Sequence, residues 1–330
     1  MNSTSSSKPW RFLRSRRIAV AACLLALFAF VGGETVARFV LGLGDPPLYL
    51  ADPKIEYLNK PGHYHRFGHN IHINAWSMRS PDFPEKKASS NELRILVIGD
   101  SVVNGGARID DSQTATAQLA SSLAKATGRP VVVANISAGS WGPQNQLEYL
   151  KRFGTFDADA AIVVWSSHDA WDVPGFGPFG VDLPTEKPML ALDELVRRYA
   201  LAKLFPPPSE SPPHTQQDVD QGIASAKELL QLLRSKRIPV AVVIHKTQTE
   251  LKGKDLEGDK LLAAVAESAD DAVFQTEAVL RPAVEKGESV FFDDIHPNPS
   301  GNALLADLYL KIVTKLLAGS ESGAAPSKTS

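Results

Sequence analysis

Short apolar runs recur along the second and third quarters of the chain. Each spans about four to six residues, the usual length of a buried strand, and is followed by polar or glycine-rich sequence. They cover residues 94–98, 131–134, 160–165 and 240–244, with a weaker candidate at 289–292. Runs that are apolar throughout, without alternation, are typical of strands buried on both faces of a parallel sheet.

Between these runs, apolar residues recur three or four positions apart, which predicts amphipathic helices. Ala115, Leu119 and Leu123 form such a stripe, and Gly128 and Pro130 follow in the order expected at a helix end. Further helices are predicted over residues 142–154, 190–204, 219–233 and 305–316. Alternating strands and helices predict an α/β fold, a three-layer α/β/α sandwich with a mainly parallel sheet of flavodoxin-like form.

The first part of the chain has a different pattern. Residues 18–33 are apolar throughout and follow five basic residues with no acid in the first 17. Sixteen residues of helix reach about 24 Å, slightly less than the ~30 Å of a bilayer core. Bases before the run and Glu34 after it predict a cytoplasmic N-terminus and a body on the other side, periplasmic or extracytoplasmic, of a cell inner membrane. A cleaved signal peptide and a secreted body is the alternative.

These patterns divide the chain into five parts. A basic cytoplasmic segment and a membrane anchor, or signal peptide, precede a proline-rich lead-in that packs on the folded domain, and a polar tail follows the domain. The predicted bounds are 1–17, 18–41, 42–92, 93–318 and a disordered 319–330.

Charge and cysteine content narrow the function. Setting aside the five N-terminal bases leaves 30 bases against 37 acids, a net charge of about −7 on the remainder. A mildly acidic body without a basic stripe argues against nucleic acid as a partner. Cys23 is the single cysteine, so the body has neither a disulfide nor thiol chemistry, and we interpret Cys23 as an inert lipid-facing residue.

Candidate chemistry follows two of the predicted strands. Gly99, Asp100 and Ser101 come directly after residues 94–98, and Asp293 and His296 come directly after residues 289–292. Ligands of open parallel sheets bind beyond the carboxyl ends of the strands. A hydroxyl nucleophile needs a base to accept its proton, and the base needs a carboxylate to fix its tautomer. Asp293 and His296 can supply both from one loop, and Asp294 is a less favoured neighbour for the carboxylate.

These residues resemble the motifs of the SGNH (GDSL-type) hydrolase family, in a membrane-anchored form known from bacterial envelopes. Residues 95–102, Ile-Leu-Val-Ile-Gly-Asp-Ser-Val, resemble its first block, and Asp293-x-x-His296 with Gly301 resembles its last. The resemblance spans about residues 93–317. It implies that Ser101 is the nucleophile, His296 the base and Asp293 the residue that orients it.

The middle blocks depart from the family pattern. An oxyanion hole would use the N–H of Ser101 and a second N–H after the next strand, for which Gly139 and Ser140 both remain candidates. In the third block, His168 stands where the family has asparagine. A neutral imidazole also offers one N–H donor, so His168 either replaces the asparagine or only bonds to Asp169.

Several other side chains are candidates for substrate contact. Arg79, in the lead-in, either binds an anionic or sugar group or forms a structural salt bridge. Trp141 can stack on a sugar or an acyl group, and His245 ends a predicted strand at the same edge of the sheet. Four histidines between residues 63 and 72 have no acidic or cysteine partners interleaved with them, which favours a solvated hairpin over a metal site. No metal or other cofactor is implied.

The sequence therefore predicts a serine ester hydrolase or O-acyltransferase that works through an acyl-enzyme. Its expected substrate is an ester, in particular O-acylated envelope carbohydrate, a class that rests on the resemblance and the anchor. The alternatives are a lipid or small-ester esterase and a non-catalytic envelope scaffold with a degenerate site.

Overall fold

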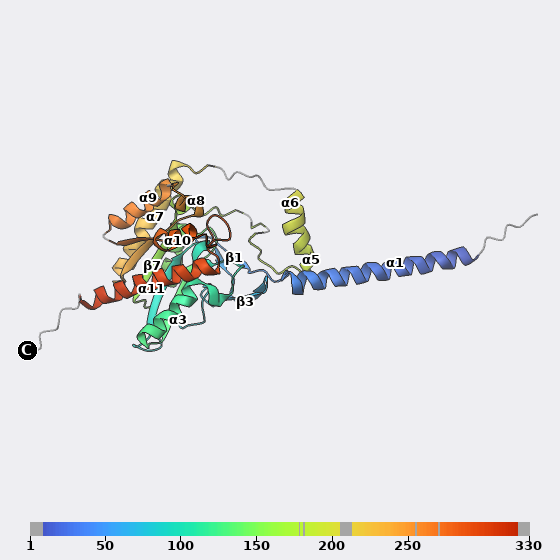
Figure 1. Cartoon of the computed structure of the whole chain (residues 1–330), viewed down its shortest axis with the longest axis horizontal. Coiled ribbons are helices and arrows are strands. Elements are labelled where there is room, and N and C mark those ends of the chain that lie inside the picture. Colours follow the sequence, from blue (N-terminus) through green and yellow to red (C-terminus); the bar gives the residue numbers. More distant parts are fainter. Residues whose placement is uncertain are drawn as a thin grey trace, which may run out of the picture. The chain divides into compact units, whose positions relative to one another are not determined.

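The computed structural model describes residues 9–177, 179–180, 182–204, 213–254, 256–269 and 271–322. The described residues form two compact units. One contains residues 9–45 and 187–204, and the other contains residues 46–186 and those from 213 onward. Figure 1 shows the whole chain. We describe each unit by itself.

A five-stranded parallel sheet organises the larger unit. Its order is β6 (Val131–Ser137), β5 (Leu93–Gly99), β7 (Ala160–Ser166), β8 (Val240–His245) and β9 (Ala272–Gln275). The chain turns to one side of β5 to form β6 and to the other side to form β7. The carboxyl ends of β5 and β7 therefore flank the switch point at which such sheets bind ligands.

Helices cover both faces of this sheet, which confirms the predicted sandwich. Alternate residues of β5 point to opposite faces: Leu96 and Ile98 join one core, and Ile95 and Val97 join the other. The first core lies under α4 (Pro143–Phe153), α7 (Gln216–Ser235) and α9 (Glu257–Glu267). The second lies under α3 (Ala115–Thr127), α10 (Glu277–Glu285) and α11 (Pro299–Ser322). In Figure 1, α3 and α11 lie side by side on their face of the sheet.

Local sequence explains where these helices start and stop. Thr114 caps α3 by accepting a hydrogen bond from the Ala117 N–H, and Gly128 ends it with φ +65°, a left-handed conformation that glycine adopts without strain. Helix α4 begins at Pro143, whose fixed φ suits the first helical position, and ends before Gly154. Both boundaries agree with the sequence prediction.

Two predictions at the C-terminal side are wrong. Residues 289–292 form no strand, since Phe291 makes only an isolated bridge to Pro297, and the fifth strand is instead β9. Val290 and Phe291 are apolar because they pack into the core beneath α11. Helix α11 continues to Ser322, beyond the expected start of a disordered tail at residue 319, and residues 323–330 lie outside the described part.

The lead-in forms two antiparallel hairpins. They pair β1 (Tyr49–Asp52) with β2 (Glu56–Asn59) and β3 (Gly62–Arg66) with β4 (His69–Ile73). His63 and His72 face each other across the second hairpin with their rings stacked 4.3 Å apart. The histidine-rich stretch is thus a hairpin, as its sequence predicts.

The smaller unit is built on α1 (Pro9–Thr35), which continues as the π-helix η1 (Val36–Val40). The 25-residue span Arg16–Val40 contains an 18-residue window with a mean hydropathy of 2.0. At 1.5 Å per residue this span reaches about 37 Å, enough to cross a bilayer. Its length and composition fit a membrane anchor and a signal sequence alike. The remainder of the unit is a helical stretch of α5 (Ala191–Glu194), η4 (Leu195–Leu201) and α6 (Ala202–Leu204), within the predicted residues 190–204. The proline-rich residues 206–213 that follow, which the sequence pattern predicts to be a linker, lie largely outside the described residues.

Candidate active site

Ser101 lies at a tight turn between β5 and the short helix α2 (Ser101–Asn104). Asp100 caps this helix, its Oδ1 accepting a 2.8 Å hydrogen bond from the Val102 N–H. A Cβ on Gly99 would lie 2.6 Å from Val103 Cγ2 and 3.0 Å from the carbonyl oxygen of Val164. Glycine is therefore required for the turn to pass close to β7, and the turn presents Ser101 at the carboxyl edge of the sheet.

Three side chains from opposite ends of the chain meet at this edge. Ser101 Oγ lies 2.9 Å from His296 Nε2, and Asp293 Oδ1 lies 2.9 Å from His296 Nδ1. A carboxylate only accepts hydrogen bonds, so Nδ1 carries a proton, and in the neutral ring Nε2 is left to accept the Ser101 hydroxyl proton. Asp294, the alternative carboxylate, instead accepts hydrogen bonds from the N–H and hydroxyl of Thr249.

Asp293 is held in its ionised form. Burial opposes its charge, but hydrogen bonds from the His296 N–H and from Arg108 outweigh that effect and lower its pKa to about 2. Arg108 Nη2 lies 2.7 Å from Asp293 Oδ2, and its guanidinium lies over the Phe292 ring at 4.5 Å. Arg108 is not among the predicted site residues, because it lies in an exposed glycine-rich loop far from Asp293 in the chain.

The parallel register of β5 and β6 places Gly139, one candidate oxyanion donor, at the position that corresponds to Ser101. Gly99 pairs with Ser137 in the parallel register, so Gly139 follows β6 by the same number of residues as Ser101 follows β5. Ser140 comes next, is exposed and has φ +52°. The space where a Cβ of Gly139 would lie is open.

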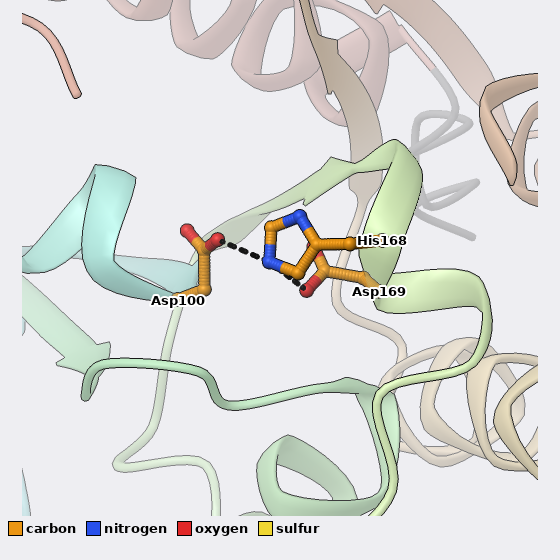
Figure 2. A group of neighbouring side chains, drawn as sticks. All are labelled: Asp100, His168 and Asp169. Atoms are coloured by element: carbon orange, nitrogen blue, oxygen red, sulfur yellow. Dashed lines mark ion pairs between the residues drawn. The ribbon is translucent and has the colours of Figure 1, made fainter. Parts of the chain in front are cut away.

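His168 lies in η3 (Ser167–Ala170), directly after β7. Its Nε2 lies 3.4 Å from Asp100 Oδ2 and 3.5 Å from Asp169 Oδ1, and Figure 2 shows the ring between the two carboxylates. Burial disfavours the charged ring, but Asp169, Asp100 and Asp172 outweigh it and raise the pKa of His168 to about 10. The neighbouring carboxylates therefore favour the protonated ring over the neutral imidazole expected from the sequence, while burial raises the pKa of Asp169 and brings that of Asp172 to about 7. Its Nδ1 makes no hydrogen bond to the described residues, and 38% of the side chain is exposed.

Among the described residues, one group has potential metal-ligand atoms within 4.8 Å of one another. It consists of Asp100, His168 and Asp169. A histidine must lose its proton to bind a metal, whereas these two buried carboxylates favour the protonated ring. Asp100 Oδ2 and Asp169 Oδ1 lie within ion-pair distance of His168 Nε2, although neither oxygen accepts a hydrogen bond from the described residues.

Sequence comparison identifies the family of this site. Residues 97–304, which include all three meeting side chains, match the model of the GDSL-like Lipase/Acylhydrolase family. The chain belongs to this family. It is accordingly an ester-bond hydrolase, as its sequence motifs predict.

Solved structures of GDSL-type esterases resemble the GDSL-like domain at low sequence identity. A lipolytic G-D-S-L protein of Veillonella parvula DSM 2008 is 16% identical, with 68% of this chain and 100% of that chain covered and a TM-score of 0.42. A two-domain esterase active on acetylated mannans is 14% identical, with 69% and 50% covered and a TM-score of 0.47. An acetyl xylan esterase is 13% identical, with 67% and 100% covered and a TM-score of 0.45. A search of curated proteins found no match.

Arg79 forms a buried salt bridge next to the site. This is the structural role that the sequence left open, and it replaces the predicted contact with substrate. Its side chain is buried and pairs with Asp111 at 2.8 Å. It also donates hydrogen bonds to the carbonyl groups of Asn104, Gly106 and Ile109. These carbonyls bracket Arg108, so Arg79 fixes the loop that brings Arg108 to Asp293.

His245 is also buried, and it contacts the loop that carries His296. It is fully buried at the end of β8, and its Nε2 donates a 2.9 Å hydrogen bond to the carbonyl oxygen of Ile295. Burial lowers its pKa despite that bond and the nearby Asp100. Its Nδ1 has no partner among the described residues. Because the ring is fully buried, it cannot contact a substrate as predicted. Its hydrogen bond to Ile295 instead stabilises the loop that carries His296.

Trp141 belongs to the core beneath α4. It has no exposed surface, and its indole N–H donates to the carbonyl oxygen of Tyr57 in the lead-in. Stacking of this ring on a substrate is therefore excluded in this structure, and its role is packing.

Proposed function

We propose that this GDSL-like hydrolase works through Ser101, His296 and Asp293. The Ser101 hydroxyl attacks the ester carbonyl carbon while its proton passes to His296 Nε2. Collapse of the tetrahedral intermediate breaks the bond to the alcohol, which leaves with the proton from His296, and an acyl-Ser101 remains. Water, activated in the same way by His296, then releases the acid and restores Ser101.

One observation carries this proposal: the two 2.9 Å contacts that join Ser101 Oγ, His296 and Asp293 in sequence. Each contact is within hydrogen-bonding distance for proton transfer without any movement of the chain. The low pKa of Asp293 supports the same roles, because an ionised carboxylate stabilises the imidazolium that forms during attack.

The oxyanion donors in this proposal come from three chain segments. The developing negative charge accepts hydrogen bonds from the N–H of Ser101, from the N–H of Gly139 or Ser140, and from the free Nδ1–H of His168. As a cation, His168 offers a charge-assisted hydrogen bond, which is stronger than one from a neutral amide. It would thus serve in place of the family's asparagine.

We further propose an O-acylated envelope carbohydrate as substrate and α1 as a retained anchor that holds the domain outside the cell inner membrane. A sugar hydroxyl in place of water would make the same acyl-enzyme an O-acyltransferase. Both points rest on the resemblance to envelope-associated relatives and on the apolar span Arg16–Val40.

A fluorophosphonate probe tests the nucleophile directly, because it reacts with an activated serine and reports on no other step. We expect stoichiometric labelling of the wild type, loss of labelling in Ser101→Ala, and normal labelling of the matched variant Ser121→Ala on the exposed face of α3. Turnover of acetylated glycans compared with short aryl esters then tests the substrate class. A wild-type chain that is folded but never labelled would instead support the scaffold alternative.

A further inference from the structure

Residues 187–204 belong to the smaller unit, although they are inserted between two segments of the larger unit, here called the catalytic unit. The chain passes from α1 to the catalytic unit after Asp45, returns at Lys187, and goes back again after Leu204. Within the insertion, α5, η4 and α6 follow one another without a break from Ala191 to Leu204.

Glu34, near the end of α1, caps the start of this helical stretch. Its two carboxylate oxygens accept 3.0 Å hydrogen bonds from the N–H groups of Ala191 and Leu192. The first N–H groups of a helix have no partner within the helix, so this cap satisfies donors that otherwise need water. Arg38 neutralises the same carboxylate at 2.8 Å.

Packing fixes the same junction. Ala37, Leu43 and Ala191 form a small buried cluster, with Leu192 and Leu195 packed against it. The Gly44 N–H also donates a 2.7 Å hydrogen bond to buried Glu194. The first turn of the insertion is therefore attached to the end of the apolar span by both polar and apolar contacts.

Beyond this junction, the helical stretch exposes apolar side chains. Val196, Ala200 and Leu204 are spaced four apart and so share one side of the helix. All three are exposed, Leu204 with 70% of its surface. Other large apolar residues of the same unit are exposed too: Met189, Leu190 and Leu201 in this stretch, and Phe39 and Val40 at the end of the apolar span. Soluble surfaces rarely carry so much exposed apolar area without a partner.

Basic residues are interspersed with this apolar surface. Arg197, Arg198 and Lys203 lie on the stretch, together with Tyr199. The acids Asp193 and Glu194 lie at its start, where Asp193 pairs with Arg197. A short helix with exposed apolar residues, flanking bases and a tyrosine has the composition of one that lies at a lipid headgroup boundary.

We propose that residues 187–204 lie in the interface of the membrane that α1 crosses, as a second lipid-binding element. This rests on the proposed anchoring role of α1. Lipid is the occupant that fits, since the stretch is fastened to the end of a membrane span and its exposed apolar residues continue those of the span. The chain of the larger unit is then joined to two membrane-associated elements, α1 and residues 187–204.

Site-specific fluorescence on the full-length protein tests the location. The protein is reconstituted into vesicles of equal parts phosphatidylcholine and phosphatidylglycerol. The native Cys23 is labelled with an environment-sensitive dye to report on α1. In a Cys23→Ser background, Val196→Cys and Leu204→Cys report on the insertion, and Lys227→Cys on the exposed side of α7 is the matched control. Quenching by acyl-chain nitroxide lipids is compared with quenching by aqueous iodide.

We expect lipid quenching at positions 196 and 204 to exceed that at position 227 by at least about twofold, with the reverse order for iodide. Iodide quenching at 196 and 204 equal to that at 227, with Cys23 quenched by lipid, would overturn the inference and leave the anchor intact. Protection of 196 and 204 from both quenchers would also overturn it, because protein then covers the stretch. Absence of lipid quenching at Cys23 would instead count against the anchor itself.

Discussion

Arg108 donates a 2.7 Å hydrogen bond to Asp293 across 185 positions of sequence, and so adds a fourth side chain to the Ser101–His296–Asp293 arrangement. His296 Nδ1 lies 2.9 Å from Asp293 Oδ1 and 3.0 Å from Oδ2, while Oδ1 also accepts from the His296 backbone N–H and Oδ2 from Arg108. The carboxylate is thereby fixed in rotation as well as in charge. Arg108 itself is about half exposed and does not contact Ser101, so we regard it as a positioning residue.

Replacing Arg108 by alanine should lower kcat while leaving KM unchanged. Exposed ion pairs contribute up to about 1 kcal/mol, which corresponds to a decrease of about fivefold. Arg108→Lys keeps the charge and should recover part of the loss. Steady-state kinetics on a soluble aryl ester measure both parameters. An increase in KM at constant kcat would show instead that Arg108 contacts the substrate.

Protonated His168 makes stability depend on pH in a defined direction. Its pKa is raised from 6.5 to about 10, so its stabilising contribution is fully present below pH 6.5 and is lost as the pH rises through 10. The difference in Tm between the wild type and His168→Asn should therefore be largest near pH 6 and shrink towards pH 10. Thermal unfolding across this range measures it. A difference that grows with pH would show that the ring is neutral in the folded protein.

The sequence was informative about the site wherever chemistry follows a buried strand. Ser101 and His168 come directly after β5 and β7, and the parallel topology alone brings such positions to one edge. Asp293 and His296 lie within hydrogen-bonding distance of each other, and His296 of Ser101, although residues 289–292 are not a strand. The family motif, not the strand pattern, is what singles them out in the sequence. β9 was missed because its four residues are only partly buried and carry no clear period.

Contacts between distant segments could not be predicted. Nothing local in the sequence marks Arg108 as the partner of Asp293. Trp141 and His245 follow or end strands, like the site residues, yet both are buried. The lead-in covers Trp141, and the 293–296 loop covers His245. Position along a strand predicts the edge of the sheet, whereas accessibility depends on which later segment packs there.

Arg79 should matter for both stability and activity, because it is the buried support of the loop that carries Arg108. Arg79→Met removes the donor to Asp111 Oδ1 and to three carbonyl groups, whereas Asp111 Oδ2 keeps its hydrogen bond from the His72 N–H. We expect a loss of about 3 kcal/mol in the free energy of unfolding, the lower end for breaking a buried pair, since Asp111 remains partly hydrated. Urea denaturation measures this loss.

Activity separates the two roles of Arg79. Measured at a temperature where the variant is fully folded, kcat should fall about as far as in Arg108→Ala. The double variant Arg79→Met/Arg108→Ala should then show no further decrease in kcat, because both substitutions remove the same contact to Asp293. Additive losses in kcat would indicate that Arg79 affects the site by another route.

The oxyanion role of His168 leads to the largest expected change in rate. His168→Ala removes both ring donors, and loss of one oxyanion donor typically costs about 100- to 1000-fold in kcat. His168→Asn supplies a neutral amide N–H at the position where the family has asparagine, and should restore at least about tenfold of that loss. Because neither substitution touches Ser101 or His296, fluorophosphonate labelling should persist in both variants at reduced rates. Equal kcat values for the alanine and asparagine variants would assign His168 to the ion-paired cluster with Asp100 and Asp169 alone.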